Sequence, residues 1–374
     1  MKKIGILGGT FNPVHNEHVS LARSAIKELG LDKLMVMPTY LSPHKSSLPA
    51  SALHRLNMLK IAFKDDEKVE VSDYEILNEG KSYTYKTVEY FKSIGYEQIY
   101  FIVGGDMLKD FKTWKYPERI LSACTLAVFE RENFYADFDK EREYFKKHFG
   151  KDFVKLSYVG KDASSTKIRV YSAYDLPDPE DAPCGVMEYI KENGLFTADK
   201  YEQFIKEHLP LKRVKHTADV VICALKKAKP LNLDERKVKL AATLHDLAKY
   251  IDYKTVKGFV LPDGVPKPVE HSFLGAFIAK EYLGVDDEEV LDAIRFHTSG
   301  KAEMSLLGKL IFVADMVEEG RDYEGVETLR KLYEEDDFEK CFVECLKEEF
   351  LHLLNKKQYI YEETLNAFRY YVKN

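Results

Sequence analysis

The sequence predicts two domains of different fold class, a doubly wound α/β domain over residues 1–197 and an all-helical domain over residues 198–374. Three observations lead to this prediction. Short apolar runs alternate with helical patterns in the first half of the chain. Strand patterns give way to amphipathic helical patterns near residue 197. The length of 374 residues, with 45% hydrophobic residues, is sufficient for two separate cores.

The first half opens with the pattern of a buried parallel strand. Residues 3–7 form a short apolar run that ends at Gly8 and Gly9, which is typical of a strand that leads into a tight turn. A helix is predicted next, because apolar residues recur at helical spacing over 19–29 and Gly30 suits a left-handed C-cap. Further strands are expected at residues 33–37, 98–103 and 125–129, and a further helix at residues 84–92.

Two glycine-rich turns follow predicted strands. They are Gly8-Gly9-Thr10 and Gly104-Gly105-Asp106. A doubly wound sheet binds its ligands at the carboxyl ends of the strands. We therefore expect both turns to border one ligand crevice.

The second half is expected to contain helices only. Amphipathic patterns predict them at residues 202–207, 216–229, 235–250, 271–283, 287–297 and 306–319, with two more near the C-terminus. The proline- and glycine-rich stretch at residues 261–268 is predicted to be a loop within this domain.

Composition limits the partners and the compartment. The net charge of -6 argues against a strongly electrostatic grip on DNA or RNA and favours small substrates. The five cysteines are odd in number and lack CxxC spacing, which fits reduced thiols in a cytoplasm. No signal peptide and no membrane span is predicted, so we expect a cytosolic protein. The sequence leaves open whether it forms homo-oligomers.

Six residues scattered over the second half have the side chains that hold a hydrolytic divalent metal. They are His216, His245, Asp246, His271, His297 and Asp315. Imidazole and carboxylate are the ligands that such metals take. The adjacent pair His245-Asp246 can present a nitrogen ligand beside an oxygen that bridges two ions. This set predicts a metal-dependent phosphohydrolase.

The first glycine-rich turn has the features of a phosphate site. Gly8 and Gly9 let the backbone approach a phosphate closely, and a helix expected to begin near Pro13 offers N–H groups and a positive dipole end to an anion. His15 and His18 are three residues apart, so both imidazoles can face one side of the first helical turn. Such a pair can stabilise charge on the α-phosphate and the leaving pyrophosphate during adenylyl transfer.

Further cations and hydroxyls are available for a nucleotide. Lys45, Lys167 and Arg169 can contribute positive charge, while Ser165 and Thr166 can donate hydroxyl hydrogen bonds to phosphate oxygens.

Residues 1–197 resemble the bacterial nicotinate-nucleotide adenylyltransferases, members of the nucleotidyltransferase superfamily with a Rossmann-like fold. The matching segments, in family order, are Gly8 through His18, Pro43-His44-Lys45, Ser82-Tyr83-Thr84, Gly104-Gly105-Asp106, Trp114, Arg131, Ser164 through Arg169, and Tyr189 through Phe196. The segment Gly8 through His18 contains the position of the HxGH element of the family, and the segment Ser164 through Arg169 corresponds to its SSTxIR element.

This resemblance implies which residues bind ATP and which bind the acceptor nucleotide. The ATP-binding set is Gly8, Gly9, Thr10, Phe11, His15, His18, Lys45, Gly104, Asp106, Ser165, Thr166 and Arg169, with His15, His18 and Arg169 catalytic and Mg²⁺ on the triphosphate. Nicotinate mononucleotide is expected to lie against Thr84, Asp106, Trp114 and Arg131, with the tryptophan stacked on the pyridine ring. Glu17 departs from the family, because it occupies the glycine position of HxGH and places a negative charge beside the phosphate path. The alternatives are a side chain directed to solvent, without effect, and one that slows turnover.

The second half resembles the HD-superfamily phosphohydrolases, most closely the bacterial branch that hydrolyses diadenosine tetraphosphate symmetrically. The matching segments are Arg213 through His216, Leu244 through Lys249, Glu270 through Gly275, Ala293 through Gly300 and Ile311 through Arg321. This order of segments makes the match specific.

The HD resemblance implies a two-metal site. His216, His245 and Asp315 are expected to bind one ion and His271 and His297 the other, with Asp246 bridging them and acting in catalysis. Two ions let a water ionise near neutral pH and attack phosphorus. Lys249 is a further catalytic candidate that would neutralise the polyphosphate. The family implies iron, and the same ligands accept manganese, cobalt or zinc. Glu319 stands where many relatives have proline, with little consequence expected.

The sequence thus predicts a bifunctional cytosolic enzyme of NAD biosynthesis and nucleotide hydrolysis. One domain would form deamido-NAD and pyrophosphate from ATP and nicotinate mononucleotide, and the other would cleave diadenosine tetraphosphate into two ADP. Two alternatives stay open. The first domain could use another phosphate acceptor or CTP, with the HD domain hydrolysing a different nucleotide, or one domain could be a nucleotide sensor without turnover.

Overall fold

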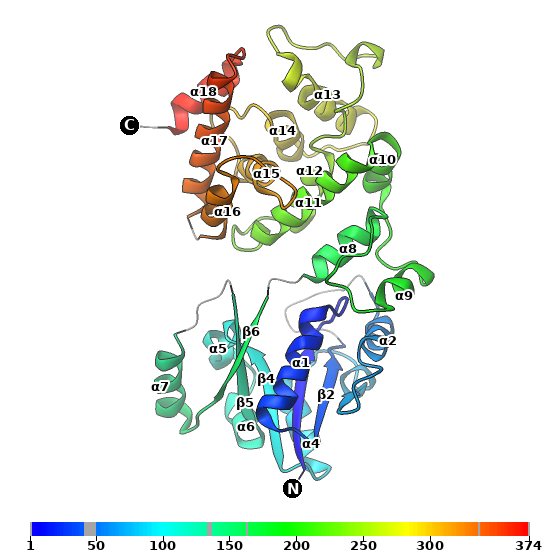
Figure 1. Ribbon diagram of the computed structural model, residues 1–374, viewed down its shortest axis with the longest axis vertical. Coiled ribbons are helices and arrows are strands. Elements are labelled where there is room, and N and C mark those ends of the chain that lie inside the picture. The colour runs from blue at the N-terminus through cyan, green and yellow to red at the C-terminus, as the bar shows by residue number, and fades with distance from the viewer. Residues whose placement is uncertain (1, 41–49, 133–136, 162–163, 336, 373–374) are drawn as a thin grey trace. The chain divides into compact units, whose positions relative to one another are not determined.

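The computed structural model describes residues 2–40, 50–132, 137–161, 164–335 and 337–372. The chain divides into two compact units (Figure 1). The first consists of Met1–Ser172 with Pro177–Phe196, and the second of Ala173–Leu176 with Thr197–Asn374. Each unit has its own core.

A parallel sheet forms the centre of the first unit. Its described strands are β1 (Lys3–Gly9), β2 (Lys33–Pro38), β3 (Val69–Val71), β4 (Gln98–Gly104), β5 (Thr125–Arg131) and β6 (Val154–Gly160), in the order β3-β2-β1-β4-β5-β6. This order is doubly wound, so the predicted α/β class is confirmed. β3 and β6 were not predicted from the sequence.

The strand order reverses between β1 and β4. Ile4 of β1 lies opposite Lys33 of β2 on one side and Ile99 of β4 on the other. A ligand crevice forms at the carboxyl ends of the strands at such a reversal. Gly8-Gly9 ends β1 and Gly104 ends β4 at this point, as the sequence predicts.

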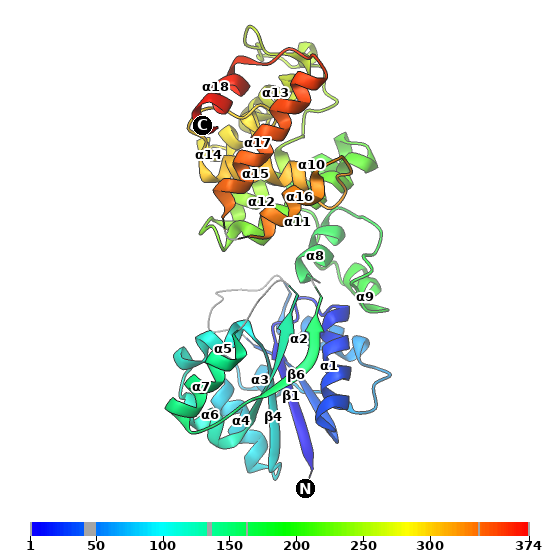
Figure 2. The same cartoon turned by 60° about the vertical axis from the view of Figure 1, so that its left-hand side comes forward.

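Helices cover both faces of the sheet (Figure 2). The described helices are α1 (Asn16–Leu29), α2 (Ala52–Ala62), α3 (Tyr74–Leu77), α4 (Thr84–Ser93), α5 (Asp106–Asp110), the 3-10 turn η1 (Phe111–Thr113), α6 (Pro117–Ala123), α7 (Phe138–Phe149), α8 (Ser165–Ala173) and α9 (Val186–Glu192). Leu7 joins the core beneath α1, α2 and α9, while Ile4 and Ile6 join the core beneath α4, α6 and α7. Burial on both faces explains why the central strands are continuous apolar runs.

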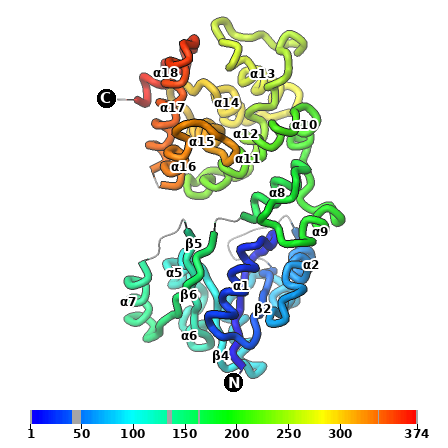
Figure 3. Tube along the Cα trace, viewed as in Figure 1, coloured from blue at the N-terminus to red at the C-terminus, as the bar shows by residue number. Residues whose placement is uncertain are grey.

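The second unit contains helices and no strand among its described residues, as predicted. They are α10 (Lys200–His208), α11 (Leu211–Ala228), α12 (Glu235–Leu244), the 3-10 turn η2 (Tyr253–Thr255), α13 (Lys267–Glu281), α14 (Glu288–Phe296), α15 (Leu306–Val317), α16 (Val326–Glu334), α17 (Phe338–Asn355) and α18 (Glu362–Tyr371). α15 lies in the middle of the bundle and packs on α11, α12, α14, α16 and α17 (Figure 3). Eight of its twelve residues are buried, which makes it the core helix.

Several helix boundaries differ from the expectation by a few residues, and two of these differences affect the site. The helix predicted over 235–250 ends at Leu244, and the one predicted over 287–297 ends at Phe296, so His245 and His297 are both C-cap residues. Three helices, α16 to α18, stand where two were predicted near the C-terminus. Among the described helices none has both the length and the apolar character required to cross a bilayer.

Candidate active sites

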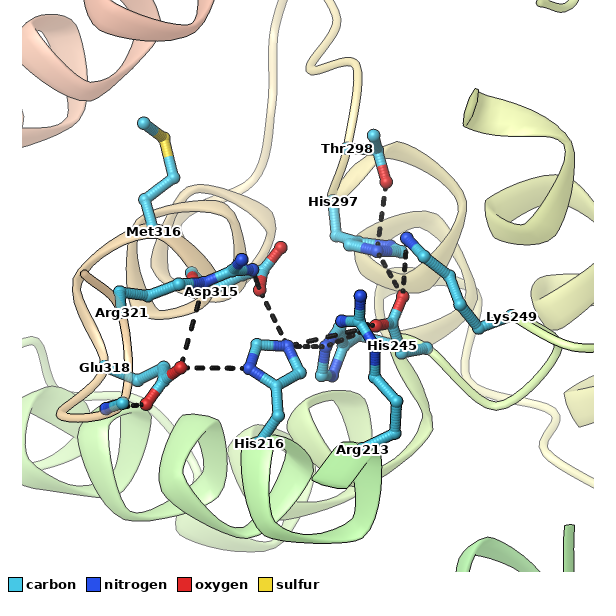
Figure 4. A network of polar contacts seen from close by, with 12 residues as sticks. Arg213, His216, His245, Lys249, His297, Thr298, Asp315, Met316, Glu318 and Arg321 are labelled. Carbon is cyan, nitrogen blue, oxygen red and sulfur yellow. Dashed lines mark hydrogen bonds and ion pairs between the residues drawn. The ribbon is translucent and has the colours of Figure 1, made fainter. Parts of the chain in front are cut away.

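The six predicted metal ligands come from five different elements and meet within the second unit. Figure 4 labels four of them, His216, His245, His297 and Asp315. α11 carries His216, α13 carries His271 and α15 carries Asp315. His245 and Asp246 follow the end of α12, and His297 follows the end of α14. The ligand atoms fall into three overlapping groups, within each of which they lie inside 4.8 Å of one another.

Asp246 stands between two pairs of histidines. Its Oδ2 lies 3.8 Å from Nε2 of both His216 and His245, whereas its Oδ1 lies 3.1 Å from Nε2 of His271 and 3.5 Å from Nε2 of His297. Each carboxylate oxygen therefore faces one histidine pair, which is the arrangement that a bridging ligand requires.

Asp315 completes the first histidine pair. Its Oδ1 lies 3.0 Å from Nε2 of His216. The geometry also permits a grouping of His245, His297 and Asp315. The structure thus brings all six residues together, and it leaves two ways of dividing them between ions.

Hydrogen bonds at Nδ1 orient three of the histidine rings so that Nε2 of each faces the cluster. Nδ1 of His245 lies 2.7 Å from the carbonyl oxygen of Ala242, and Nδ1 of His297 lies 2.8 Å from that of Ile294. Both acceptors are three residues earlier at a helix end, where carbonyl groups lack helical partners. Nδ1 of His216 instead faces Oε1 of Glu318 at 3.0 Å. A proton on Nδ1 leaves Nε2 free to bind a metal, so these partners fix the coordinating nitrogen.

Burial and neighbouring charges keep His245, His271 and Asp246 in the protonation state that a metal needs. Burial lowers the pKa of His245 to about 3 and the pKa of His271 to about 4. Burial would raise the pKa of Asp246, but the surrounding histidines and Lys249 hold that pKa well below its usual value. His216 is the exception: burial opposes its charge, yet Asp315 and Glu318 raise its pKa to about 9. A metal at His216 must therefore displace a proton near neutral pH.

Three cations neutralise the carboxylates of the cluster. Arg213 donates from Nη1 to Asp246 Oδ2 at 3.0 Å, and Arg321 donates to Asp315. Lys249 places Nζ 3.3 Å from Asp246 Oδ1 and 3.0 Å from Nε2 of His271. Four imidazole nitrogens and two carboxylates are the donor set of a divalent transition metal, so the residues fit a pair of such ions.

Glu318 was not among the residues singled out from the sequence. Its side chain is only 3% exposed, and it accepts the N–H of Gly320 as well as facing His216. Arg330 of α16 fixes this segment by donating to the carbonyl oxygens of Glu318 and Arg321 at 2.6 and 2.7 Å. The spacing of Asp315 and Glu318, one helical turn apart, was the available sequence signal.

In the first unit, the loop between β1 and α1 carries the histidine pair. α1 begins at Asn16, so the expectation of a helix starting near Pro13 was wrong. His15 is the N-cap, and its backbone N–H donates to Nδ1 of His18 at 3.2 Å. The two rings stack with centroids 3.6 Å apart, so both imidazoles lie on one side of the helix end.

The histidine pair is half-buried and close to a cation. Burial and, to a smaller extent, the charge of Arg131 lower the pKa of His15 to about 4. Burial, His15 and Arg131 together hold the pKa of His18 well below its ordinary value. Both rings are therefore neutral near pH 7. Phe11, 2% exposed and with φ of 46°, packs its ring edge on His18 at 4.8 Å.

The first turn of α8 is bonded to the same loop. Ser165 Oγ donates to the carbonyl oxygen of Pro13 at 2.7 Å. Arg169 donates from Nη1 to the carbonyl oxygen of Asn12 at 2.7 Å and from Nη2 to Thr166 Oγ1 at 2.9 Å. Two segments that are about 150 residues apart in the sequence are thus joined by direct hydrogen bonds.

Arg55 braces the loop from the other side and was missed in the sequence. It is 1% exposed and donates to the carbonyl oxygens of Thr10 at 2.8 Å and Tyr40 at 3.0 Å. Burial lowers its pKa to about 10. A buried guanidinium beside the glycine-rich turn adds positive potential where phosphate is expected. Lys45, another expected cation, lies outside the described residues.

The glycine turns are tight for a steric reason. A Cβ on Gly104 would lie 2.2 Å from Asp106 Oδ1, and a Cβ on Gly9 would lie 3.0 Å from the ring of Phe11, while Gly8 would meet only ordinary contacts. Asp106 begins α5, and its Oδ1 is buried without a hydrogen-bond partner among the described residues. That oxygen remains available to a ligand.

The two remaining substrate candidates lie on other elements. Thr84 begins α4, and Trp114 follows η1, half-buried, with its ring 5.2 Å from that of Phe111 and 6.3 Å from that of Phe101. Neither lies on the elements that carry the histidine pair.

Comparisons with known proteins match both units. The family model described as cytidylyltransferase-like matches residues 6–170, and the HD domain model matches residues 213–320. A probable nicotinate-nucleotide adenylyltransferase/Ap4A hydrolase of Mycoplasma genitalium is 29% identical over 332 residues, which cover 86% of this chain and 89% of that protein.

Two further relatives each match one half. A probable nicotinate-nucleotide adenylyltransferase of Clostridium botulinum is 38% identical over 198 residues, covering 52% of this chain and 98% of that protein. A solved HD superfamily hydrolase of Clostridium acetobutylicum, described as involved in NAD metabolism, is 33% identical and covers 46% of this chain and 95% of its own, with a TM-score of 0.42.

Proposed function

The chain belongs to the nicotinate-nucleotide adenylyltransferase family through its first half and carries an HD domain in its second half, and on this premise we propose that it is a bifunctional enzyme. Residues 1–197 form deamido-NAD and pyrophosphate from ATP and nicotinate mononucleotide. Residues 198–374 hydrolyse diadenosine tetraphosphate to two ADP. A relative whose printed name carries both activities matches 86% of this chain, and this is the observation that carries the proposal.

For adenylyl transfer we assign His15 and His18 to the triphosphate. Their neutral, stacked rings lie at the N-terminal end of α1, where free backbone N–H groups and the helix dipole favour an anion. Arg169 and the hydroxyls of Ser165 and Thr166 are assigned to the phosphates with Mg²⁺, together with Lys45 and the turns at Gly8 to Phe11 and Gly104. Such groups act by positioning and charge stabilisation, because the reaction needs no covalent nucleophile.

For the acceptor nucleotide we assign Thr84, Asp106, Trp114 and Arg131. The buried, unpartnered Oδ1 of Asp106 supports a role as a hydrogen-bond acceptor for substrate. The half-buried indole of Trp114 has a ring available for stacking on pyridine.

For hydrolysis we assign the six-residue cluster to two divalent ions, with iron as the first candidate and manganese, cobalt and zinc as others. Two bound ions would supply Lewis acidity and lower the pKa of a water near phosphorus. Asp246 faces both histidine pairs and would bridge them. Lys249, 3.3 Å from Asp246 Oδ1, would then turn its charge toward the polyphosphate.

We also place the protein in the cytosol, with small nucleotides as its partners. All five cysteines are free in the structure, which supports a reducing compartment. The net charge of -6 supports nucleotides over nucleic acids as ligands.

Two variants of the full-length chain separate the activities. His18→Ala should abolish deamido-NAD formation and leave hydrolysis of diadenosine tetraphosphate intact, because the histidine belongs to the first unit. Asp246→Ala should abolish hydrolysis and metal content, measured by elemental analysis, and leave adenylyl transfer intact as the internal control for folding. Full hydrolysis by Asp246→Ala would reject the metal assignment.

A substrate panel tests the first reaction itself. Wild-type protein should prefer ATP and nicotinate mononucleotide over CTP and over phosphopantetheine. Preference for either of the latter would replace the proposed activity with another nucleotidyl transfer. Tight nucleotide binding without any turnover would identify this unit as a sensor.

A further inference from the structure

Glu17 occupies the glycine position of the HxGH motif, between the two histidines, and its side chain is bonded within the first unit. Its Oε2 accepts the hydroxyl of Tyr158 at 2.5 Å and the backbone N–H of Lys161 at 2.9 Å. Tyr158 lies on β6, and Lys161 follows its last residue. The carboxylate is thus directed to the end of β6 and is not free in solvent, which answers a question that the sequence left open.

The contact with Lys161 lies next to the segment that carries the other predicted phosphate contacts. Lys161 directly follows β6 and stands three residues before Ser164 in the sequence, where the segment that carries Ser165, Thr166 and Arg169 begins. Glu17 itself lies between His15 and His18. One carboxylate therefore ties the histidine turn to the end of β6, three residues before the segment that supplies the other phosphate contacts.

The histidine turn is also bonded directly to two residues within that segment. Ser165 Oγ holds the carbonyl oxygen of Pro13, and Arg169 holds that of Asn12. These bonds use the first turns of α8, whereas Glu17 fixes the point where β6 ends. Together these bonds connect the histidine turn both to α8 and to the end of β6.

The charge of Glu17 is accommodated locally. It lies in the first turn of α1, where a carboxylate is favoured by the helix dipole. Burial and the neighbouring Glu17 charge both raise the pKa of Tyr158, so this phenol keeps its proton and remains a donor. The opposing effect of the carboxylate is repulsion of a triphosphate near the histidines.

We propose that Glu17 is a positioning residue for adenylyl transfer, which holds the histidine turn and the Ser164–Arg169 segment at the separation that the triphosphate requires. This inference rests on the proposed adenylyltransferase function. It predicts that the tether contributes more to ATP binding than charge repulsion removes.

The test uses four variants of the full-length protein: Glu17→Ala, Glu17→Gln, Tyr158→Phe and Glu28→Ala. Glu17→Ala removes the tether and the charge, whereas Glu17→Gln removes the charge but keeps an amide oxygen as acceptor. Tyr158→Phe removes one bond and leaves α1 unchanged. Glu28→Ala is the matched control, because Glu28 Oε2 accepts the N–H of Ser157 and so ties the far end of α1 to β6.

The expected result is a split between KM and kcat. Tyr158→Phe loses one hydrogen bond to a charged group and should raise the KM for ATP about tenfold. Glu17→Ala loses both bonds and should raise this KM further, and neither variant should change kcat much. Glu17→Gln and Glu28→Ala should stay near wild type. If Glu17→Ala and Glu17→Gln both lower the KM, repulsion dominates and the proposal is wrong. Equal KM in all variants would also overturn it.

Amide hydrogen exchange at Lys161 measures the Glu17 tether directly, without relying on the proposed adenylyl transfer. The N–H should be protected in wild type and in Glu17→Gln and should exchange faster in Glu17→Ala. If wild type forms no deamido-NAD, the proposed function fails while the tether is still measured. If transfer occurs and protection does not depend on Glu17, the tether itself is refuted.

Discussion

Removal of the Glu318 carboxylate should weaken metal binding without touching a ligand. Glu318 Oε1 faces Nδ1 of His216 at 3.0 Å, while its Oε2 accepts the N–H of Gly320. The carboxylate therefore fixes both the ring orientation and the nitrogen that carries the proton. In Glu318→Ala both bonds are lost, and in Glu318→Gln the amide oxygen can replace only one of them.

The size of the loss follows from these bonds. Partners behind a metal-binding histidine typically contribute 10- to 100-fold to metal affinity. A hydrogen bond to a charged group contributes about 1.5–3 kcal/mol, which corresponds to a similar range. We expect about tenfold weaker binding in Glu318→Gln and nearer to hundredfold in Glu318→Ala.

The pH of the measurement decides how much of this loss is seen. Glu318 helps to raise the pKa of His216 to about 9, so at neutral pH the metal must displace a proton from that ring. Without Glu318 the pKa falls and the competition from protons weakens, which partly offsets the loss. The full effect should therefore appear above pH 9.

The assay is competition for cobalt with a chromophoric chelator at pH 7 and at pH 9.5. Glu319→Gln is the control, because it makes the same chemical change one residue away on an exposed side chain. Wild type and Glu319→Gln should agree at both pH values. An affinity of Glu318→Ala equal to that of wild type at pH 9.5 would refute the role of this carboxylate.

Three further predictions concern the first unit. Gly104→Ala should impair adenylyl transfer, measured as the KM for the acceptor nucleotide, because its Cβ would lie 2.2 Å from Asp106 Oδ1. Folding lowers the pKa of His15 from 6.5 to about 4, so the unfolded chain binds this proton at a higher pH than the folded protein does. The free energy of unfolding should therefore fall by about 3 kcal/mol as the pH is lowered from 6.5 through about 4. Thermal melting should show a shallower loss in His15→Asn over that interval. Cys184 is exposed, whereas burial raises the pKa of Cys223 to about 12, so Cys184→Ser should remove the fast reaction with a thiol reagent at pH 8.

The sequence predicts the elements that are buried on both sides and misses those that are not. β1, β2, β4 and β5 are apolar along their centres, so their runs were visible. β6 is an edge strand with alternating exposed residues, and β3 has only three residues. Neither strand shows a continuous apolar run in the sequence. Both lie at an edge of the sheet, where a strand pairs with one neighbour only and is not buried along its whole length.

Helix ends were the least predictable part of the second unit, and two of them form its site. The apolar pattern of α12 and α14 continues beyond the last helical residue, because His245, Leu247 and His297 are buried like the helix before them. The end of each helix releases carbonyl groups, and those of Ala242 and Ile294 accept Nδ1 of the two histidines. Periodicity reports burial and not the point where helical bonding stops.

The same distinction separates the ligands from the residues that orient them. A ligand is recognisable by its type, since few side chains bind divalent ions, and the six candidates do converge. A residue that orients a ligand can be any acceptor, and its identity depends on how the backbone turns. Glu318 reaches His216 because the chain turns after α15, with Gly320 N–H bound to the carboxylate and Arg330 holding the carbonyl oxygens of the turn. Its neighbour Glu319 has the same side chain and faces outward, so only the path of the backbone distinguishes the two.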